Sequence, residues 1–334
     1  MTINTTPTGE RLEAPRMILA PMEGVIDAVM RELLTSIGGY ERCVTEFVRV
    51  SQTILPARVF LRLCPELKEG GRTPSDTPVY VQLLGSDCRL MADNAAVADD
   101  LGAPGIDLNF GCPAKTVNRS QGGASLLKTP HIIRDVCRAV RDRVNPDKPV
   151  TAKIRLGFDD DRDFETLLRL LEDTGISELT IHARTRRQGY RPPAHWGKIK
   201  LAHQHLPYPV IANGELWSPA DVRACLAASG TQAVMLARGA LCRPDLARAV
   251  LADYGTNDAP PISWDDIRGY LLAFLDANCA RYDARYAVNP VKQWLVYLKH
   301  YHPQAARLFD VAKRITDSNA MRALILEQAV AKVA

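Results

Sequence analysis

The sequence predicts an α/β fold, a (β/α)8 TIM barrel followed by an all-α helical bundle. Eight short apolar runs alternate with amphipathic segments of helical pattern over roughly 240 residues, which matches the build and size of this barrel. Polar side chains stand at or just past the carboxyl ends of the runs, and no strand pattern follows Tyr254. A doubly wound parallel sheet is the competing fold. The lack of a G-x-G-x-x-G motif after the first run favours the barrel.

The predicted strands are short and aliphatic, and the segments between them carry the apolar periodicity of helices. The strands are predicted at 17–22, 43–48, 79–84, 105–109, 150–155, 179–182, 210–213 and 233–237. Helices are predicted, among others, at 88–100, 131–143, 163–174, 219–228 and 244–252. Because each helix returns the chain to the start of a parallel strand, the carboxyl ends of all strands meet at one face.

The carboxyl-terminal part has the pattern of a separate helical domain. Residues 255–261 have the composition of a linker. Four helices are predicted after it: Ser263 caps the first, Asn289-Pro290 begins the second, Pro303 begins the third, and Asp317-Ser318 caps the last. We therefore divide the chain into a flexible tail (1–14), a barrel (15–255) and a helical bundle (256–334).

Composition limits the class of protein. The chain has 334 residues, 46% of them hydrophobic and 24% charged, with a net charge of +4, which is ordinary for a globular protein and compatible with an anionic partner. No apolar run approaches the roughly 20 residues of a membrane helix, and the Thr-rich start does not resemble a secretory signal. The eight cysteines show neither a C-x-x-C pair nor zinc spacing. We expect reduced cysteines, no metal, no membrane contact, a cytoplasmic location and a monomer.

Seven polar or sulfur-containing side chains lie where predicted strands end. In a TIM barrel these ends form the face that carries the active site. One such residue could stand there by chance, but seven on one rim indicate a functional site. They are Met22, Gln82, Asn109, Lys153, His182, Asn213 and Arg238.

Cys112 is the strongest candidate for chemistry. It follows the predicted strand 105–109 and stands between Gly111 and Pro113, with a Gly-rich segment at 120–124 after it. A thiol in a cleft can donate a proton or attack as a nucleophile. The alternative is a small buried residue at a tight turn. The position at a strand end favours the functional interpretation.

Two cationic side chains on one predicted strand point to an anionic ligand. Lys153 and Arg155 alternate and therefore face the same way, and a lysine inside a barrel is costly unless it meets an anion. Lys153 could form a Schiff base, lie beside an anionic cofactor ring, or belong to an ion pair in the barrel floor. His182 on the next strand could donate to a cofactor or be a satisfied core histidine.

The loops after the last three strands indicate contact with phosphates. The segments 213–215 and 237–239 combine glycines with Arg238 at two neighbouring strand ends, where barrels often bind phosphate. Arginines for phosphates and a tyrosine for stacking are typical of nucleic-acid contact, and a solvated loop is the simpler alternative. The loop after the sixth strand carries Arg184, Arg186, Arg187, Tyr190 and Arg191.

Four motifs resemble those of tRNA-dihydrouridine synthases, and the resemblance covers nearly the whole chain. The motifs are Ala-Pro-Met-Glu-Gly-Val at 20–25, Asp-Leu-Asn-Phe-Gly-Cys-Pro at 107–113, Lys-Ile-Arg-Leu-Gly at 153–157 and His-Ala-Arg-Thr at 182–185. Glu23, residues 45–50, and Lys-Gln-Trp-Leu at 292–295 with Tyr297 are similar to the bacterial C-type subfamily, which is associated with uridine 16 of the tRNA D-loop. The chain departs from the basic set of that subfamily at Pro290.

The resemblance implies an FMN-containing barrel followed by a helical tRNA-binding domain, with Cys112 as the general acid. The residues expected to bind FMN are Pro21, Met22, Glu23, Gln82, Lys153, His182, Asn213, Gly214, Glu215, Ala237, Arg238 and Gly239. The residues expected to contact the uridine or the tRNA are Arg49, Asn109, Arg155, Tyr190, Lys292, Tyr297 and Lys313, and the arginine-rich loop adds Arg184 and Arg186.

The reaction that the resemblance implies is reduction of a uridine C5=C6 bond. Hydride passes from N5 of reduced FMN to C6, and Cys112 protonates C5 from the opposite face. Lys153 stabilises the anionic reduced ring, NADPH reduces the flavin again, and the base is flipped into the cleft. The alternatives are a flavin barrel acting on free pyrimidines, another uridine in tRNA, and an RNA-binding protein with an inactive barrel. The helical tail and the arginine-rich loop speak against free pyrimidines.

Overall fold

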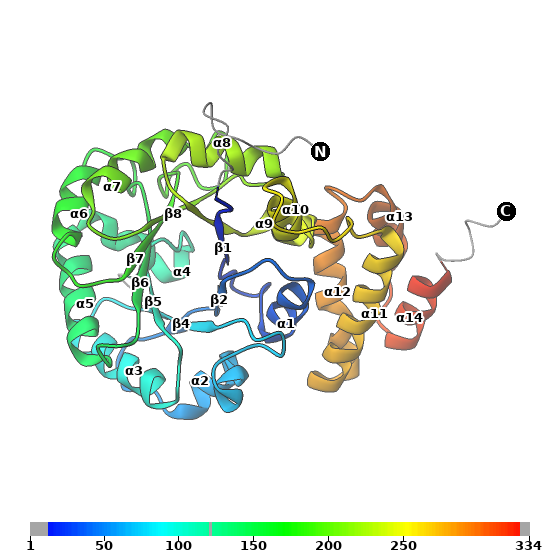
Figure 1. Cartoon of the computed structure of the whole chain (residues 1–334). Coiled ribbons are helices and arrows are strands. Elements are labelled where there is room, and N and C mark those ends of the chain that lie inside the picture. The colour runs from blue at the N-terminus through cyan, green and yellow to red at the C-terminus, as the bar shows by residue number, and fades with distance from the viewer. Residues whose placement is uncertain (1–12, 120–121, 328–334) are drawn as a thin grey trace.

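The computed structural model describes residues 13–119 and 122–327, in which a closed parallel β-barrel is followed by a helical bundle (Figure 1). The sheet has nine strands in the order β2-β1-β9-β8-β7-β6-β5-β4-β3, and a further pairing of β2 with β4 closes the ring. The short strand β3 lies outside that ring, beside β4. The predicted (β/α)8 barrel with a helical bundle is therefore confirmed.

The strands are β1 Arg16–Leu19, β2 Arg42–Val44, β3 Val48–Arg49, β4 Val79–Leu84, β5 Ile106–Asn109, β6 Val150–Arg155, β7 Glu178–His182, β8 Val210–Asn213 and β9 Ala233–Leu236. The helices of the barrel are α1 Ala28–Ile37, α2 Ala57–Leu63, α3 Cys88–Asp100, α4 Lys115–Arg119, α5 Pro130–Arg143, α6 Phe164–Leu171, α7 Ile199–His205, α8 Pro219–Ser229, α9 Arg238–Cys242 and α10 Leu246–Asp253, with 3-10 turns at Pro65–Glu69, Gly123–Lys128 and Trp196–Lys198.

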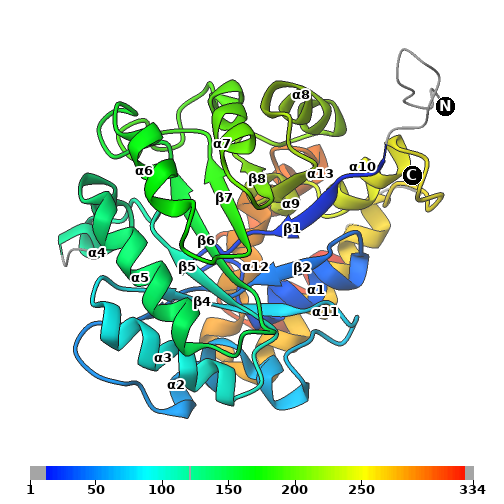
Figure 2. The same ribbon diagram turned by 60° about the vertical axis from the view of Figure 1, so that its left-hand side comes forward.

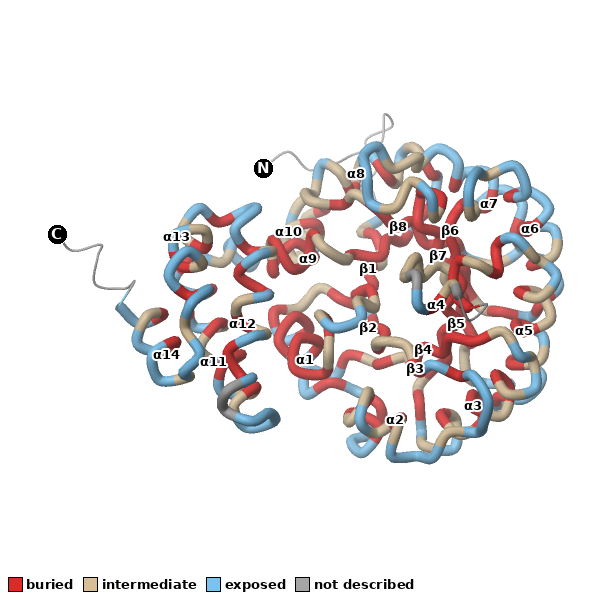
Figure 3. The backbone as a smooth tube through the Cα atoms, turned by 180° about the vertical axis from the view of Figure 1, so that it is seen from behind, coloured by how far each residue is buried: buried red, intermediate tan, exposed pale blue. Residues whose placement is uncertain are grey.

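The helices surround the strands and bury their apolar faces against them. Figure 2 shows the helices outside the ring of strands, and Figure 3 shows buried positions on the strands and on the inner sides of the helices. Local signals set the helix starts: the Asp27 carboxylate accepts from Met30 N–H at α1, and the Ser218 hydroxyl accepts from Asp221 N–H at α8. No helix of the described residues is both long and apolar enough to cross a membrane.

Two predicted strands differ from the observed ones by more than one residue at an end. The first strand ends at Leu19, since the chain turns after Pro21, where Val25 N–H donates to the Met22 carbonyl at 3.0 Å. The second is divided into β2 and β3. At the break the Thr45 hydroxyl accepts the N–H of Gln82 at 3.0 Å, so a side chain replaces a rung of the ladder there. This break leaves the segment after Thr45 free to form part of the barrel rim.

The bundle consists of α11 Trp264–Arg281, α12 Ala284–Leu298, α13 Pro303–Ala312 and α14 Ser318–Glu327. Three predicted starts are confirmed: Ser263 and Asp266 form a capping box, Pro303 opens α13, and the Asp317 carboxylate accepts from Ala320 N–H at 2.8 Å. The predicted start of the second helix at Asn289-Pro290 is wrong.

The helix α12 begins at Ala284, and Pro290 lies inside it. The turn before Pro290 buries Ala287 and Val288 completely, and this apolar burial outweighs the hydrogen bond that proline cannot make. The proposed domain boundary at 255/256 falls between α10 and α11, and most of the proposed tail, residues 1–12, lies outside the described residues.

The bundle packs against the barrel beside α1 and α9 (Figure 1). Trp294 is buried, and its indole N–H donates to the Leu241 carbonyl at 3.1 Å while its ring meets Phe274 edge-on. At the other end, the Tyr282 hydroxyl donates to the Asp27 carboxylate at 3.0 Å. These contacts place the bundle next to the rim of the barrel.

A buried ion pair holds the helix that follows the first rim loop. Arg31 is fully buried and forms a two-point pair with Glu66, at 2.9 and 3.0 Å. We predict that Glu66→Ala lowers the free energy of unfolding by about 3–5 kcal/mol, because it leaves the guanidinium buried without its partner. Arg89→Ala, which removes one side of an exposed pair with Asp93, should cost less than about 1 kcal/mol in the same urea titration. Equal losses in both variants would contradict this account.

Candidate active site

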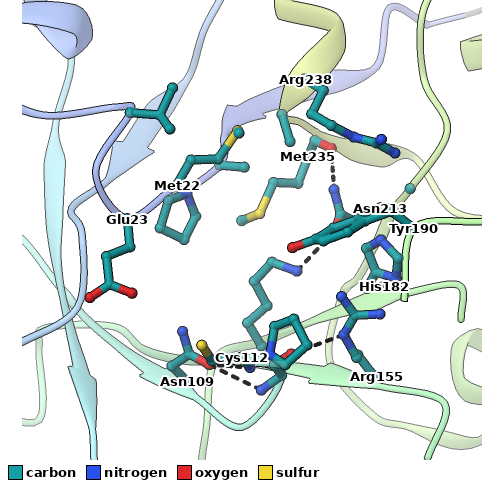
Figure 4. Close-up of a pocket in the computed structure, with 18 of the residues that line it drawn as sticks. Met22, Glu23, Asn109, Cys112, Arg155, His182, Tyr190, Asn213, Met235 and Arg238 are labelled. Atoms are coloured by element: carbon teal, nitrogen blue, oxygen red, sulfur yellow. Dashed lines mark hydrogen bonds between the residues drawn. The ribbon is translucent and has the colours of Figure 1, made fainter. Parts of the chain in front are cut away.

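A cavity of about 560 Å³ opens at the carboxyl ends of the barrel strands, within the usual range of ligand pockets. It brings together most of the residues that the sequence singles out. Figure 4 shows Cys112 and Asn109 on one side of it and Arg238 and Met235 on the other. The predicted residues that line it are Pro21, Met22, Glu23, Gln82, Asn109, Cys112, Lys153, Arg155, His182, Tyr190, Asn213, Gly214, Glu215, Ala237, Arg238, Gly239 and Tyr297.

Five predicted contact residues do not line this cavity. Arg49 and Lys313 are exposed, and Lys292 is half-buried on α12. Arg186 is half-buried, with its guanidinium 5.1 Å from the ring centre of Phe158. Arg184 is fully buried and pairs with the Glu215 carboxylate, so its side chain is not available to a ligand at the surface.

Cys112 lies in a loop that hydrogen bonds hold in place from several sides. The Asn109 side-chain oxygen accepts from the N–H groups of Gly111 and Cys112, at 3.0 Å each. The Asn118 amide donates to the Cys112 carbonyl at 3.1 Å, and Ala124 N–H donates to the same oxygen at 3.1 Å. Burial raises the pKa of the Cys112 thiol. The thiol therefore keeps its proton at neutral pH and is suited to donate it.

Lys153 rises from β6 into the cavity. Its ammonium group donates to the Asn213 side-chain oxygen at 2.9 Å, and Asn213 in turn donates to the Met235 carbonyl at 2.8 Å. Burial, with the nearby Arg155 charge, lowers the pKa of Lys153 to about 7. Lys153 is half-buried and its hydrogen-bond partner is neutral, so a negative charge that enters the cavity would favour the protonated form of the amine.

His182 adds a neutral imidazole beside Lys153. Burial, followed by the charges of Arg155 and Lys153, lowers its pKa well below the ordinary value. Its Nδ1 is buried and has no hydrogen-bond partner among the described residues. Buried polar atoms are rarely left unpaired, so this nitrogen is an attachment point for a ligand.

On the far side of the cavity lie Arg238 and a close approach between the backbones of Gly239 and Leu216. The Arg238 guanidinium lies 4.9 Å from the Tyr190 ring centre and 4.8 Å from that of Trp217. A Cβ on Gly239 would stand 2.0 Å from the Leu216 carbonyl, so only glycine fits there. Glu215 adopts a positive φ of 59° and accepts from the Trp217 indole at 2.9 Å. The Arg238 guanidinium gives this corner a positive charge that suits a phosphate.

Arg155 joins the cysteine loop to the arginine-rich loop. It is 3% exposed and donates to the Gly111 carbonyl at 2.9 Å and to the Gly189 carbonyl at 2.9 Å. Its guanidinium also lies 5.3 Å from the ring centre of Tyr190, which is 53% exposed at the mouth of the cavity. Arg155 thus positions both the thiol loop and an aromatic ring that a planar base could stack on.

Sequence reasoning missed several lining residues. Glu46 and Phe47 lie at the break between β2 and β3, where a continuous strand was predicted. Trp217 lies two positions beyond Glu215, and an aromatic residue in a rim loop is a signal that could have found it. Met235 lies inside β9 and has the pattern of any core residue, so nothing in the sequence distinguishes it. Among the described residues no cluster of three or more His, Cys, Asp or Glu could hold a metal ion.

The fold and the cavity define a TIM-barrel protein with an enzyme-like site at the carboxyl face of its strands. The family model described as "Dihydrouridine synthase (Dus)" matches residues 18–330, and the chain belongs to this family. It is 47% identical over 294 residues to the "tRNA-dihydrouridine(16) synthase" of Shewanella oneidensis, covering 88% of this chain and 92% of that protein. It is 45% identical over 322 residues to the protein of the same name from Pseudomonas putida, covering 95% and 100%.

Solved structures support the fold. The chain is similar to histamine dehydrogenase from Rhizobium sp. 4-9, with a TM-score of 0.56 and 13% identity over 84% of this chain and 49% of that one. It is also similar to the old yellow enzyme homologue from Zymomonas mobilis, with a TM-score of 0.50 and 13% identity over 74% and 90%. At such low identity the likeness shows the barrel and nothing about its ligands.

The low pKa of Lys153 predicts a pH dependence of stability in the ligand-free protein. The unfolded chain holds a proton on Lys153 up to its ordinary pKa of about 10.4, whereas the folded protein releases it above about 7. The unfolded state therefore binds more protons between these values, so this contribution makes stability rise with pH there, and the full cost applies below pH 7.

We predict that the stability difference between the wild type and Lys153→Met shifts toward the wild type by about 2 kcal/mol from pH 7 to pH 9, measured by urea titration. The difference between the two proteins cancels the groups that titrate in both. A pH-independent difference would contradict the perturbed lysine.

Proposed function

We propose that this protein reduces the C5=C6 bond of uridine 16 in tRNA to 5,6-dihydrouridine with a bound flavin. Its family and the names of its relatives support this reaction and this position. The observation that carries the proposal is the layout of the cavity, in which a protonated thiol on the Cys112 loop faces a space lined by Lys153, His182 and Arg238. A reduction needs such a separate proton donor opposite the source of hydride.

The residues present fit FMN. The unpaired His182 Nδ1 and the half-buried Lys153 amine suit the polar edge of a flavin ring, and the Arg238 corner suits its phosphate. When bound in its reduced form, FMN supplies the hydride for C6 of the base. The residues that we propose to hold it are Pro21, Met22, Glu23, Gln82, Lys153, His182, Asn213, Gly214, Glu215, Ala237, Arg238 and Gly239.

The residues of the protein have distinct roles in the proposed reaction. Lys153 favours negative charge on the ring beside it, and Cys112 holds the proton that C5 receives. Arg155 and Tyr190 position the base at the mouth, which a flipped nucleotide can reach. Asn109 holds the thiol loop through its Oδ1 and donates one N–H to Gln82, and its second N–H is left to contact the base.

The tRNA contacts are proposed on the surface around the mouth. Arg49, Arg186, Lys292, Tyr297 and Lys313 offer positive charge and one aromatic ring from the barrel and the bundle. For Arg184 we propose a different role from the predicted one, because its buried side chain holds Glu215 in place. NADPH as the reductant, a monomeric state and a cytoplasmic location stay predictions from the sequence.

The alternatives differ in one measurable property, the acceptor that oxidises the flavin. We expect that an unmodified tRNA transcript reoxidises the photoreduced protein under anaerobic conditions, whereas free uridine at equal concentration does so at least about a hundredfold more slowly, because it lacks the phosphates that the rim recognises. Comparable rates would favour an enzyme for free pyrimidines. A colourless protein that takes up no FMN would favour an inactive RNA-binding barrel.

The role of Cys112 gives a second test. We predict that Cys112→Ala retains FMN and its absorbance spectrum but lowers dihydrouridine formation in tRNA by roughly 10²–10⁴-fold, the usual worth of a positioned general acid. Cys88→Ala is the matched control, since Cys88 is also half-buried but lies on α3 outside the cavity. Near-normal turnover in Cys112→Ala would remove the thiol from the mechanism.

A further inference from the structure

A chain of hydrogen bonds runs beneath the cavity from Asp107 to the backbone of the cysteine loop. Asp107 is 1% exposed, and its carboxylate accepts from Gln82 Nε2 and from Thr151 Oγ1, both at 2.6 Å. Gln82 Oε1 accepts from Asn109 Nδ2 at 2.8 Å. Asn109 Oδ1 then accepts from the N–H of Cys112 at 3.0 Å. Two side chains, those of Gln82 and Asn109, therefore connect the carboxylate to the thiol loop.

The register of the barrel strands builds this chain. Gln82 on β4 pairs with Asp107 on β5, and Asp107 pairs with Thr151 on β6, so the three lie in one layer. Asn109 is two positions beyond Asp107 on the same strand and therefore points the same way, one layer closer to the cavity. The carboxylate does not itself line the cavity, whereas Gln82 and Asn109 do.

The groups at the two ends of this series of hydrogen bonds fix the direction of every hydrogen bond in it. A carboxylate only accepts hydrogen bonds, so Gln82 must turn its NH₂ group to Asp107 and its oxygen to Asn109. Backbone N–H groups only donate, so Asn109 must turn its oxygen to the cysteine loop and its NH₂ group to Gln82. Both ends require the same orientation of both amides. Because Gln82 is 0% exposed, water does not compete for either group.

A buried carboxylate in this layer carries a free-energy cost for folding. Burial raises the pKa of Asp107, and no Lys or Arg among the described residues forms an ion pair with it. A buried charge of this kind opposes folding, and an apolar side chain would avoid that cost. What an apolar side chain could not supply is a fixed orientation of the Gln82 amide.

We propose that Asp107 is a positioning residue, which fixes the amides of Gln82 and Asn109 and through them the place of the Cys112 thiol. The inference deepens the proposed function, since it takes Cys112 as the proton donor. It assigns Asp107 no contact with substrate or flavin. Its effect is on how tightly the cysteine loop is held.

The test is the rate at which iodoacetamide alkylates Cys112 in the full-length protein at fixed pH, followed by mass spectrometry of the peptide that contains it. We expect at least fivefold faster alkylation in Asp107→Leu, because the loop loses the oriented amides that anchor it. Asp107→Asn should stay within twofold of the wild type, since its oxygen can accept from Gln82 and its NH₂ group can donate to the Thr151 hydroxyl. Thr151→Val removes the other hydrogen bond of the same carboxylate and should also stay within twofold.

Two results would overturn the proposal. One is an alkylation rate within twofold of the wild type in Asp107→Leu, and the other is an equal acceleration in Thr151→Val, which would indicate general loosening of the barrel. If Asp107→Leu does not fold, Gln82→Met interrupts the same chain one step later and carries the same expectation and the same contradiction. The assay needs neither tRNA nor reductant. Failure of the proposed proton donor, seen as full turnover in Cys112→Ala, is therefore distinguishable from failure of the positioning role.

Discussion

The two hydrogen bonds from the backbone of the cysteine loop to Asn109 Oδ1 are the constraint on which the site depends. They turn the end of β5 into a rigid loop and set the thiol at the edge of a cavity whose other walls come from strands far away in the sequence. Arg155 also holds this loop, because its guanidinium donates to the Gly111 carbonyl. A thiol in a loose loop could be just as protonated, but it could not face one atom of a bound base.

Electrostatics organises the rest of the cavity. Lys153 is half-buried and Arg155 is buried. Among the described residues they donate to amide and carbonyl oxygens, and burial lowers the pKa of both. Among the described residues neither cation forms an ion pair with the carboxylates that line the cavity, so an anionic group that enters can pair with them. The same burial raises the pKa of the Cys112 thiol and keeps His182 neutral. One low-dielectric cavity thus produces a proton donor and a receptor for an anion together.

Strand ends were predictable from the sequence, whereas side-chain partners were not. The period of the apolar runs gave the barrel, and its known polarity brought Met22, Lys153 and Arg238 to one face. The division of the second strand depends on a hydrogen bond to Thr45, which no periodicity reveals. The burial of Arg184 depends on Glu215 from the next loop, so composition alone suggested a surface contact. The early start of α12 reflects packing that overrides the local signal at Pro290.

The position of the product shows whether this cavity reduces one defined uridine in tRNA. The purified protein is incubated with unmodified tRNA transcript and NADPH, and dihydrouridine is mapped along the tRNA by mass spectrometry of nuclease fragments. We expect dihydrouridine at position 16 and at no other uridine. Dihydrouridine at a different position would contradict the assigned specificity, and a transcript that stays unmodified while the protein holds FMN would contradict the reaction itself.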